Sequence, residues 1–216
     1  MRLRTVLFDL DGTLVDQFQA IYRCHVFAMR QIGLPEPTFE QVKRAIGRGL
    51  DDAIRDLAGQ ENVARILPIY LDHWNATSLH DAGLFPGSTE LLAALRARGV
   101  RCAALTNKRG QASREVCAHL GLTPLLDGIF GAGDTRWLKP QREFAEHALR
   151  TLDATAAEAA LVGDSIYDVA AALNADLAFF GVTTGTHDAA ALRAAGAKEI
   201  FPDLATATPA ILARVQ

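Results

Sequence analysis

The sequence predicts an α/β fold, a doubly wound parallel sheet with a small α-helical domain inserted after its first strand. Short apolar runs that end in polar or glycine-rich turns alternate along the chain with Ala- and Leu-rich stretches of helical length. Such short runs are typical of strands buried on both faces, and their alternation with helices is typical of a parallel sheet. Residues 17–81 carry helical patterns and no convincing strand, which predicts the insert.

The expected core elements follow one another in order. Strands are expected at residues 6–8, 102–105, 129–130, 161–162 and 177–182. Helices are expected at residues 88–98, 111–120, 142–152 and 166–175. Ser88 is a suitable N-cap for the first of these helices, and Gly99 and Gly121 are natural helix stops. The succession brings the carboxyl ends of the strands to one edge, where open α/β sheets bind their ligands.

The insert is expected to be a small helical bundle, with helices at residues 20–32, 39–46, 50–58 and 63–77. Turn signals separate these helices at residues 33–35, at residues 47–49 and at Gly59. The chain is therefore expected to divide into a core domain of residues 1–16 and 83–216 and a helical domain of residues 17–82. The hinges are expected near Asp16 and near residues 81–83.

Composition and charge exclude several kinds of partner. The net charge is −3, which provides neither a basic stripe for nucleic acid nor a polybasic patch for a membrane surface. No stretch approaches the roughly 20 apolar residues of a membrane span, and the first apolar run, broken by Asp9, is too short for a signal peptide. Cys24, Cys102 and Cys117 form no CxxC pair, so we expect reduced thiols in a cytoplasmic protein. The sequence indicates no oligomeric state.

Two acidic residues follow the first expected strand. Asp9 and Asp11 are two positions apart, so in extended backbone their side chains project to the same side. Carboxylates this close repel unless a cation screens them, and the pair suits one nucleophile and one general acid/base beside a metal. Gly12 allows a tight turn after them. The alternative is an Asx-type turn that only closes the strand.

Polar residues also follow three later strands. Thr106 and Asn107 offer a hydroxyl and amide N–H groups that can hold a phosphate oxygen, and Lys139 offers a point charge for phosphate. Asp164 follows the strand at residues 161–162, and Asp168 lies one helical turn further on. Carboxylates of this kind suit Mg²⁺, which binds few of them and keeps several waters. The alternatives are helix capping by Thr106 and by the acids, and a solvated surface lysine.

Together these segments resemble the motifs of the haloacid dehalogenase superfamily of phosphohydrolases. Residues 9–16 are similar to its first motif, residues 106–107 to its second, residues 139–140 to its third and residues 163–168 to its fourth. The insert resembles the α-helical cap of the branch that contains phosphoglycolate phosphatases and β-phosphoglucomutases. The resemblance covers essentially the whole chain, although residues 141–143 and 173–176 depart from the pattern of any one characterised subfamily.

The resemblance implies a role for each candidate residue. Asp9 would attack phosphorus and become an aspartyl phosphate, and Asp11 would protonate the leaving oxygen and then deprotonate the hydrolytic water. The phosphoryl oxygens would be held by Gly12, Thr106, Asn107 and Lys139. A Mg²⁺ cofactor would be held by the Asp9 side chain, the Asp11 main-chain carbonyl and Asp164, with Asp168 as a ligand or as nearby support.

The implied activity is hydrolysis of a small phosphorylated metabolite, with phosphoglycolate as the first candidate and sugar phosphates beside it. Arg48, in the turn at residues 46–49, is expected to face the core and to contact an anionic leaving group. The alternative is a solvated arginine between two glycines. The sequence thus predicts a substrate that is small and phosphorylated without naming it.

Single residues distinguish this chain from other members of the superfamily. Haloacid dehalogenases and phosphonoacetaldehyde hydrolases lack an Asp where this chain has Asp11. Mutases similar to β-phosphoglucomutase carry a His five residues after the Asp that matches Asp16, where this chain has Ile21, and His25 is a poor substitute. Phospho-accepting receiver domains lack such a helical insert. A mutase and a non-catalytic phosphate-binding relative stay as alternatives to the phosphatase.

Overall fold

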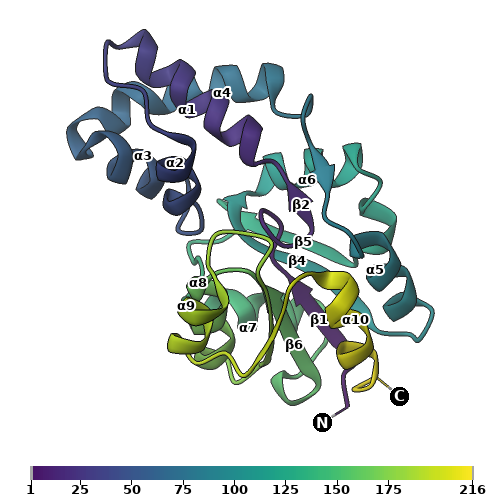
Figure 1. The fold of residues 1–216 in the computed structure, drawn as a ribbon. Helices are drawn as coiled ribbons and strands as arrows, with labels where there is room; N and C mark the ends of the chain where they lie inside the picture. The colour runs from purple at the N-terminus through teal and green to yellow at the C-terminus, as the bar shows by residue number, and fades with distance from the viewer. Residues whose placement is uncertain (1, 216) are drawn as a thin grey trace.

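The core of the molecule is a six-stranded parallel sheet, as seen in a computed structural model that describes residues 2–215 (Figure 1). The strands are β1 Thr5–Phe8, β4 Arg101–Arg109, β5 Gly128–Ala132, β6 Ala159–Gly163, β7 Ala178–Val182 and β8 Glu199–Phe201. Their order in the sheet is β5-β4-β1-β6-β7-β8. The order steps outward from β1 in both directions, which confirms the predicted doubly wound sheet.

Helices cover both faces of the sheet because successive residues of a buried strand point to opposite sides. Val6 and Phe8 of β1 pack with the helices of one face, which are α5 Ser88–Arg96, α6 Gly110–His119 and α10 Leu204–Leu212. Leu7 packs on the other face with α7 Arg142–Thr151 and α8 Ile166–Asn174. The helix α9 Ala189–Ala194 packs against α8, and short 3₁₀ helices lie at η2 Thr123–Leu125 and η3 Ala156–Glu158.

The helical insert lies between two short strands, β2 Val15–Asp16 and β3 Gly83–Leu84, which pair antiparallel with Asp16 opposite Gly83. Its helices are α1 Phe18–Gln31, α2 Phe39–Ala45, α3 Leu50–Ala58 and α4 Val63–Thr77, with the 3₁₀ helix η1 Gln60–Asn62. They form an apolar cluster of their own, with Ile54 and Ile66 fully buried. The four expected helices are therefore present, and the chain leaves and re-enters the core side by side (Figure 1).

Some local expectations were wrong or incomplete. Ser88 does not cap α5; Gly87 occupies that position with φ 89°, and the Ser88 hydroxyl donates instead to the Leu14 carbonyl, 3.0 Å away. This bond ties α5 to the segment that enters the insert. The elements β8, α9 and α10 were not expected from the sequence. β8 has three residues, α9 has six and α10 contains Pro209, so none of them has a strong local pattern. Among the described residues no helix is long and apolar enough to cross a membrane.

Candidate active site

The polar residues expected at strand ends meet at one edge of the sheet. Asp9 follows β1, Thr106 lies in β4 and Asp164 follows β6, and these three strands are neighbours in the sheet. Lys139 comes from the loop between β5 and α7, and all four side chains are buried. The carboxyl ends of parallel strands share an edge, so residues that are more than 150 positions apart come into contact here.

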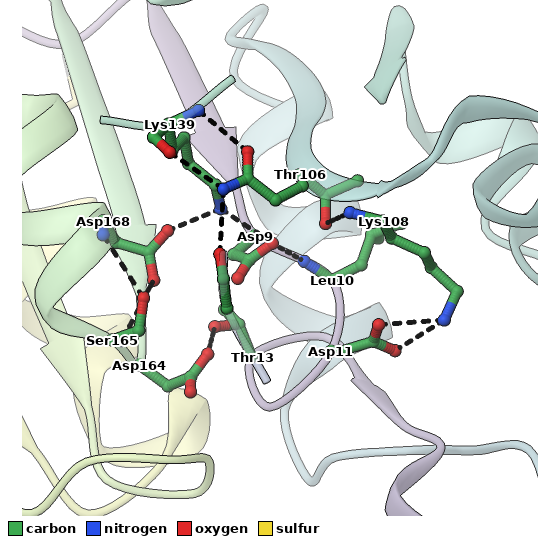
Figure 2. A network of polar contacts seen from close by, with 12 residues as sticks. Asp9, Leu10, Asp11, Thr13, Thr106, Lys108, Lys139, Asp164, Ser165 and Asp168 are labelled. Carbon is green, nitrogen blue, oxygen red and sulfur yellow. Dashed lines mark hydrogen bonds and ion pairs between the residues drawn. The ribbon is translucent and has the colours of Figure 1, made fainter. Parts of the chain in front are cut away.

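Lys139 is the cation at the centre of this site. Its amine lies 2.6 Å from Asp168 Oδ1 and 2.9 Å from Asp9 Oδ1, and its side chain is 1 % exposed (Figure 2). Burial alone would lower the pKa of the amine, but the charges of Asp168 and Asp9 outweigh burial and raise it. Lys139 is therefore protonated and fixed in place, as a phosphate-binding lysine has to be.

The acidic residues around Lys139 carry more negative charge than it neutralises. Burial raises the pKa of Asp9 to about 6 against the opposing charge of Lys139, and the Asp168 charge raises it further. Burial also raises the pKa of Asp164 to about 7, with the charges of Asp168 and Asp9 adding to the effect. Carboxylate oxygens of all three acids lie within 4.8 Å of one another. This crowded set of hard oxygen ligands fits a divalent cation such as Mg²⁺, which would relieve the repulsion.

Asp164 accepts hydrogen bonds from the hydroxyl groups of Thr13 and Thr186, which were not among the predicted site residues. Thr13 Oγ1 donates to Asp164 Oδ1 at 2.9 Å, and Thr186 donates to Oδ2 from its N–H at 2.8 Å and its hydroxyl at 3.0 Å. The only signal for Thr186 is its place in the loop after β7, another strand of the same sheet. Gly12 has φ 93°, and a Cβ atom there would lie 2.7 Å from the Asp164 carboxylate, so the turn needs glycine.

Asp168 both caps a helix and contacts the site. It is the third residue of α8 and forms a capping box with Ser165, whose N–H and hydroxyl donate to Asp168 Oδ2 at 3.0 and 2.6 Å. Its other oxygen accepts the bond from Lys139. Both carboxylate oxygens thus have protein partners, so Asp168 is placed to orient Lys139 beside Asp9.

Asn107 connects the site to the helical insert. Its Nδ2 donates to the carbonyls of Gly47 and Lys139 at 2.8 and 2.9 Å, and its Oδ1 accepts from the Lys139 N–H at 2.8 Å. The amide is therefore engaged with backbone groups, and it holds the Lys139 loop rather than pointing free toward a phosphoryl oxygen. The neighbouring Thr106 hydroxyl accepts from the Lys108 N–H at 3.2 Å.

Asp11 and Asp9 line the same cavity, but their carboxylates pair with different lysines. The extended backbone of β1 ends at Phe8, before either acid. The Leu10 carbonyl then accepts hydrogen bonds from the N–H groups of residues 13–15 in a tight turn. Asp11 instead pairs with Lys108, whose amine lies 2.8 Å from Oδ2 and 3.1 Å from Oδ1 (Figure 2). Lys108 was missed in the sequence, where it has no signal beyond following Asn107. Its amine also lies 4.4 Å from the centre of the Trp74 ring in the insert.

A cavity of about 170 Å³ opens between this edge of the sheet and the insert, with Asp9, Asp11 and Thr106 on its core side. The turn predicted at residues 46–49 does face it, through Gly47 and Gly49. Arg48 itself is not on the cavity wall, and its guanidinium pairs with Asp56 on α3. The structure therefore brings every predicted site residue together except Arg48.

Comparison with known proteins agrees with this arrangement. The sequence model of the haloacid dehalogenase-like hydrolase family matches residues 6–182. A plasmid-encoded phosphoglycolate phosphatase of Cupriavidus necator is 34 % identical over 96 % of this chain and 92 % of its own. A 5′-nucleotidase of Pseudomonas aeruginosa is 28 % identical over 95 % of this chain and 94 % of its own. The solved structure of a haloacid dehalogenase-like family hydrolase from Streptococcus pneumoniae superposes with a TM-score of 0.87 at 22 % identity, covering 99 % of both chains.

The family match spans most of the chain, from β1 to the end of β7, and includes all four segments that meet at the site. The relatives match over nearly their whole lengths, so the insert is included as well. The chain therefore belongs to the haloacid dehalogenase-like hydrolase family, a family of enzymes, and is similar to phosphoglycolate phosphatases.

Proposed function

We propose that the protein is a Mg²⁺-dependent phosphatase that hydrolyses a small-molecule phosphomonoester through an aspartyl phosphate on Asp9. One observation carries the proposal: the buried Asp9 carboxylate lies 2.9 Å from the Lys139 amine and beside Asp164 and Asp168. A carboxylate next to a fixed cation and a metal-binding set is arranged to attack a phosphoryl group whose charge both can neutralise. The 34 % identity to a phosphoglycolate phosphatase supports the same chemistry.

The chemistry divides into two displacements at phosphorus. A carboxylate oxygen of Asp9 forms a bond to phosphorus while the ester oxygen leaves, and Asp11 gives that oxygen a proton. Water then attacks phosphorus, Asp11 takes a proton from it, and the bond to Asp9 breaks to release inorganic phosphate. Thr106 and Lys139 hold the phosphoryl oxygens, with the backbone at Gly12 beside them. Asp9, Asp164 and the Asp11 carbonyl would hold Mg²⁺, which would supply charge neutralisation at the phosphoryl group.

We also propose that residues 17–82 act as a cap domain over a core of residues 1–16 and 83–216. The insert has its own apolar cluster and joins the core through the paired strands β2 and β3. It contacts the site through Gly47, which accepts a bond from Asn107, and through Trp74, which lies under Lys108. A cap in this place would exclude water and contact the leaving group.

The substrate class is a small phosphorylated metabolite of the cytoplasm, either phosphoglycolate-like or a sugar phosphate. Mutase chemistry is the second candidate, but Ile21 stands where such mutases carry a catalytic His, which favours hydrolysis. A nucleic acid partner is not proposed, because the net charge of −3 offers no basic stripe. A membrane partner is not proposed either, and no helix of the described residues is long and apolar enough to span a membrane.

The test is phosphate release from phosphoglycolate, sugar phosphates, nucleotides and p-nitrophenyl phosphate, each with Mg²⁺ and with EDTA. Release should require Mg²⁺ and should fall by at least about 10³-fold in Asp9→Asn. The matched control is Asp72→Asn, an exposed Asp on α4, which should keep full activity. Full activity in Asp9→Asn would refute the proposal. Conversion of a sugar phosphate to a positional isomer, with no phosphate released, would favour a mutase.

A further inference from the structure

The part of the cavity that lies within the helical insert has mostly apolar walls. Its lining there includes Ile46, Leu50, Tyr70, Leu71 and Trp74, from α3, α4 and the turn before α3. Asp9 and Asp11 line the same cavity from the core side. An ester whose phosphorus is next to Asp9 would therefore extend its leaving group between these apolar and aromatic side chains.

Two polar side chains of the insert, His25 and Asn75, line the cavity beside these apolar walls; Asn75 is exposed, whereas His25 is buried. His25, in the middle of α1, lines the cavity and is 1 % exposed. Neither of its ring nitrogens has a hydrogen-bond partner among residues 2–215. Its ring contacts Tyr70, with centroids 4.7 Å apart. A buried polar group without a partner lowers stability, so an unpaired imidazole on the wall of a binding cavity indicates a ligand group that completes its bonds.

The charge of His25 decides which ligand group this is. Burial lowers the pKa of the imidazole to about 4, so it is neutral near pH 7 and offers one N–H donor and one acceptor nitrogen. A neutral imidazole matches a hydroxyl group, which both donates and accepts, and gives no charge to bind a carboxylate.

The cations near the cavity do not change this conclusion. Arg48 is turned toward Asp56, and Lys108 is paired with Asp11 through both carboxylate oxygens. Arg109 also lines the cavity, but its side chain is exposed and Glu115 lines the same cavity with the opposite charge. The interior within the insert therefore favours a neutral leaving group over an anionic one such as glycolate.

We propose that His25 is a specificity-determining residue that hydrogen-bonds a hydroxyl of a neutral leaving group whose ring or apolar surface lies against Tyr70 and Trp74. The proposal rests on the phosphatase function above and names its substrate class: monoesters of a hydroxyl-bearing alcohol with an apolar or ring-shaped body. Phosphoglycolate is then a poorer substrate than such an ester.

The test compares matched esters that differ in one hydroxyl. Benzyl phosphate is measured beside the monophosphates of meta- and para-benzenedimethanol, which add a hydroxymethyl group to the same ring, and beside phosphoglycolate. The kcat/KM of the better hydroxymethyl ester should exceed that of benzyl phosphate by about tenfold. This is the effect expected of one buried hydrogen bond that benzyl phosphate cannot form. His25→Leu should abolish that preference, and His25→Gln should retain part of it because the amide can donate and accept. His80→Leu, an exposed histidine after α4, should keep the preference.

A second measurement separates this proposal from the catalytic one. Dissociation constants of the same esters are measured by calorimetry on Asp9→Asn, with and without His25→Leu, where no turnover is needed. The hydroxymethyl ester should bind about tenfold tighter than benzyl phosphate only while His25 is present. Equal affinities, or a preference that survives His25→Leu, would overturn the role of His25 whether or not the enzyme turns over. A phosphoglycolate preference that His25→Leu leaves intact would overturn it as well.

Discussion

Lys108 donates two hydrogen bonds to the carboxylate of Asp11, with nitrogen–oxygen distances of 2.8 and 3.1 Å. Both side chains are about nine-tenths buried, at 7 % and 10 % exposed, so solvent screens the pair little. The same amine lies over Trp74 of the insert. The proposed general acid is therefore oriented by a lysine that also contacts the insert, and this relationship leads to the first prediction.

Lys108→Met should impair proton donation to the leaving group. We expect kcat for alkyl phosphates to fall by about 10²-fold, because an unoriented Asp11 is a poor general acid. The loss for p-nitrophenyl phosphate should be much smaller, because p-nitrophenolate leaves without a proton. Steady-state kinetics on both esters measure the difference, with the exposed Lys198→Met as control. Equal losses on both substrates would show that Lys108 acts in some other way.

Lys139→Met should destabilise the metal-free protein strongly. Removal of the amine leaves the buried carboxylates of Asp9 and Asp168 without their shared cation, a change that costs about 3–5 kcal/mol in buried pairs. Urea unfolding in EDTA measures the loss, and Mg²⁺ should restore part of it. Lys198→Met should unfold as the wild type does. A loss below about 1 kcal/mol would contradict the buried ion-pair network.

The stabilising effect of Mg²⁺ should grow with pH. The pKa values of Asp9 and Asp164 are raised from 3.8 to about 6 and about 7, first by burial and then by the charges of neighbouring acids. A carboxyl group with a raised pKa favours the folded state at low pH and loses that contribution as pH rises through its folded value. In EDTA, the contribution of these two groups to unfolding free energy should therefore decline between pH 3.8 and about 7.

Thermal unfolding with Mg²⁺ and with EDTA checks this pH dependence. The Mg²⁺-induced rise in Tm should be larger at about pH 8 than at about pH 5, because the ion binds ionised carboxylates and has to displace protons at the lower pH. Asp164→Asn should reduce both the rise and its pH dependence. A rise in Tm that is the same at both pH values would place the metal elsewhere.

Thr186→Val should weaken Mg²⁺ binding without changing the fold. The substitution keeps the shape but removes the hydroxyl that donates to Asp164 Oδ2 at 3.0 Å, while the N–H bond at 2.8 Å remains. Loss of a group that orients a metal ligand typically costs about 10- to 100-fold in metal affinity. The activation constant for Mg²⁺ measures the effect. Thr183→Val is the matched control, because its hydroxyl donates to Pro202 instead, and equal constants in the two variants would refute the role of Thr186.

Arg48→Ala should leave substrate preference unchanged. Its guanidinium is 39 % exposed and pairs with Asp56, and such exposed pairs contribute little. The ratio of kcat/KM for phosphoglycolate to that for a sugar phosphate should stay within about twofold of wild type. Arg55→Ala, which removes the similar pair with Asp52 on α3, is the control. A selective loss on phosphoglycolate would restore the hypothesis that Arg48 binds an anionic leaving group.

The sequence predicted the strands of the site and the residues at their carboxyl ends well, because both depend on local patterns. Buried strands are visible in the sequence as short apolar runs, and Asp9, Thr106 and Asp164 lie at their carboxyl ends. The order of strands in a parallel sheet then brings those ends together. The insert was predicted for the same reason, since four stretches of helical periodicity with turn residues between them are visible without any knowledge of the fold.

The sequence by itself thus determined the α/β class, the place of the insert and the acids, threonine and lysine of the site. Only the tertiary structure decided the partners of those residues: Lys108 for Asp11, Thr186 for Asp164, Asp56 for Arg48 and the apolar cavity for His25. The physical reason is separation along the chain. Lys108 and Asp11 are 97 positions apart. Periodicity and turn residues indicate only local structure, so they do not predict which distant charge or hydroxyl comes within hydrogen-bond distance when the chain packs.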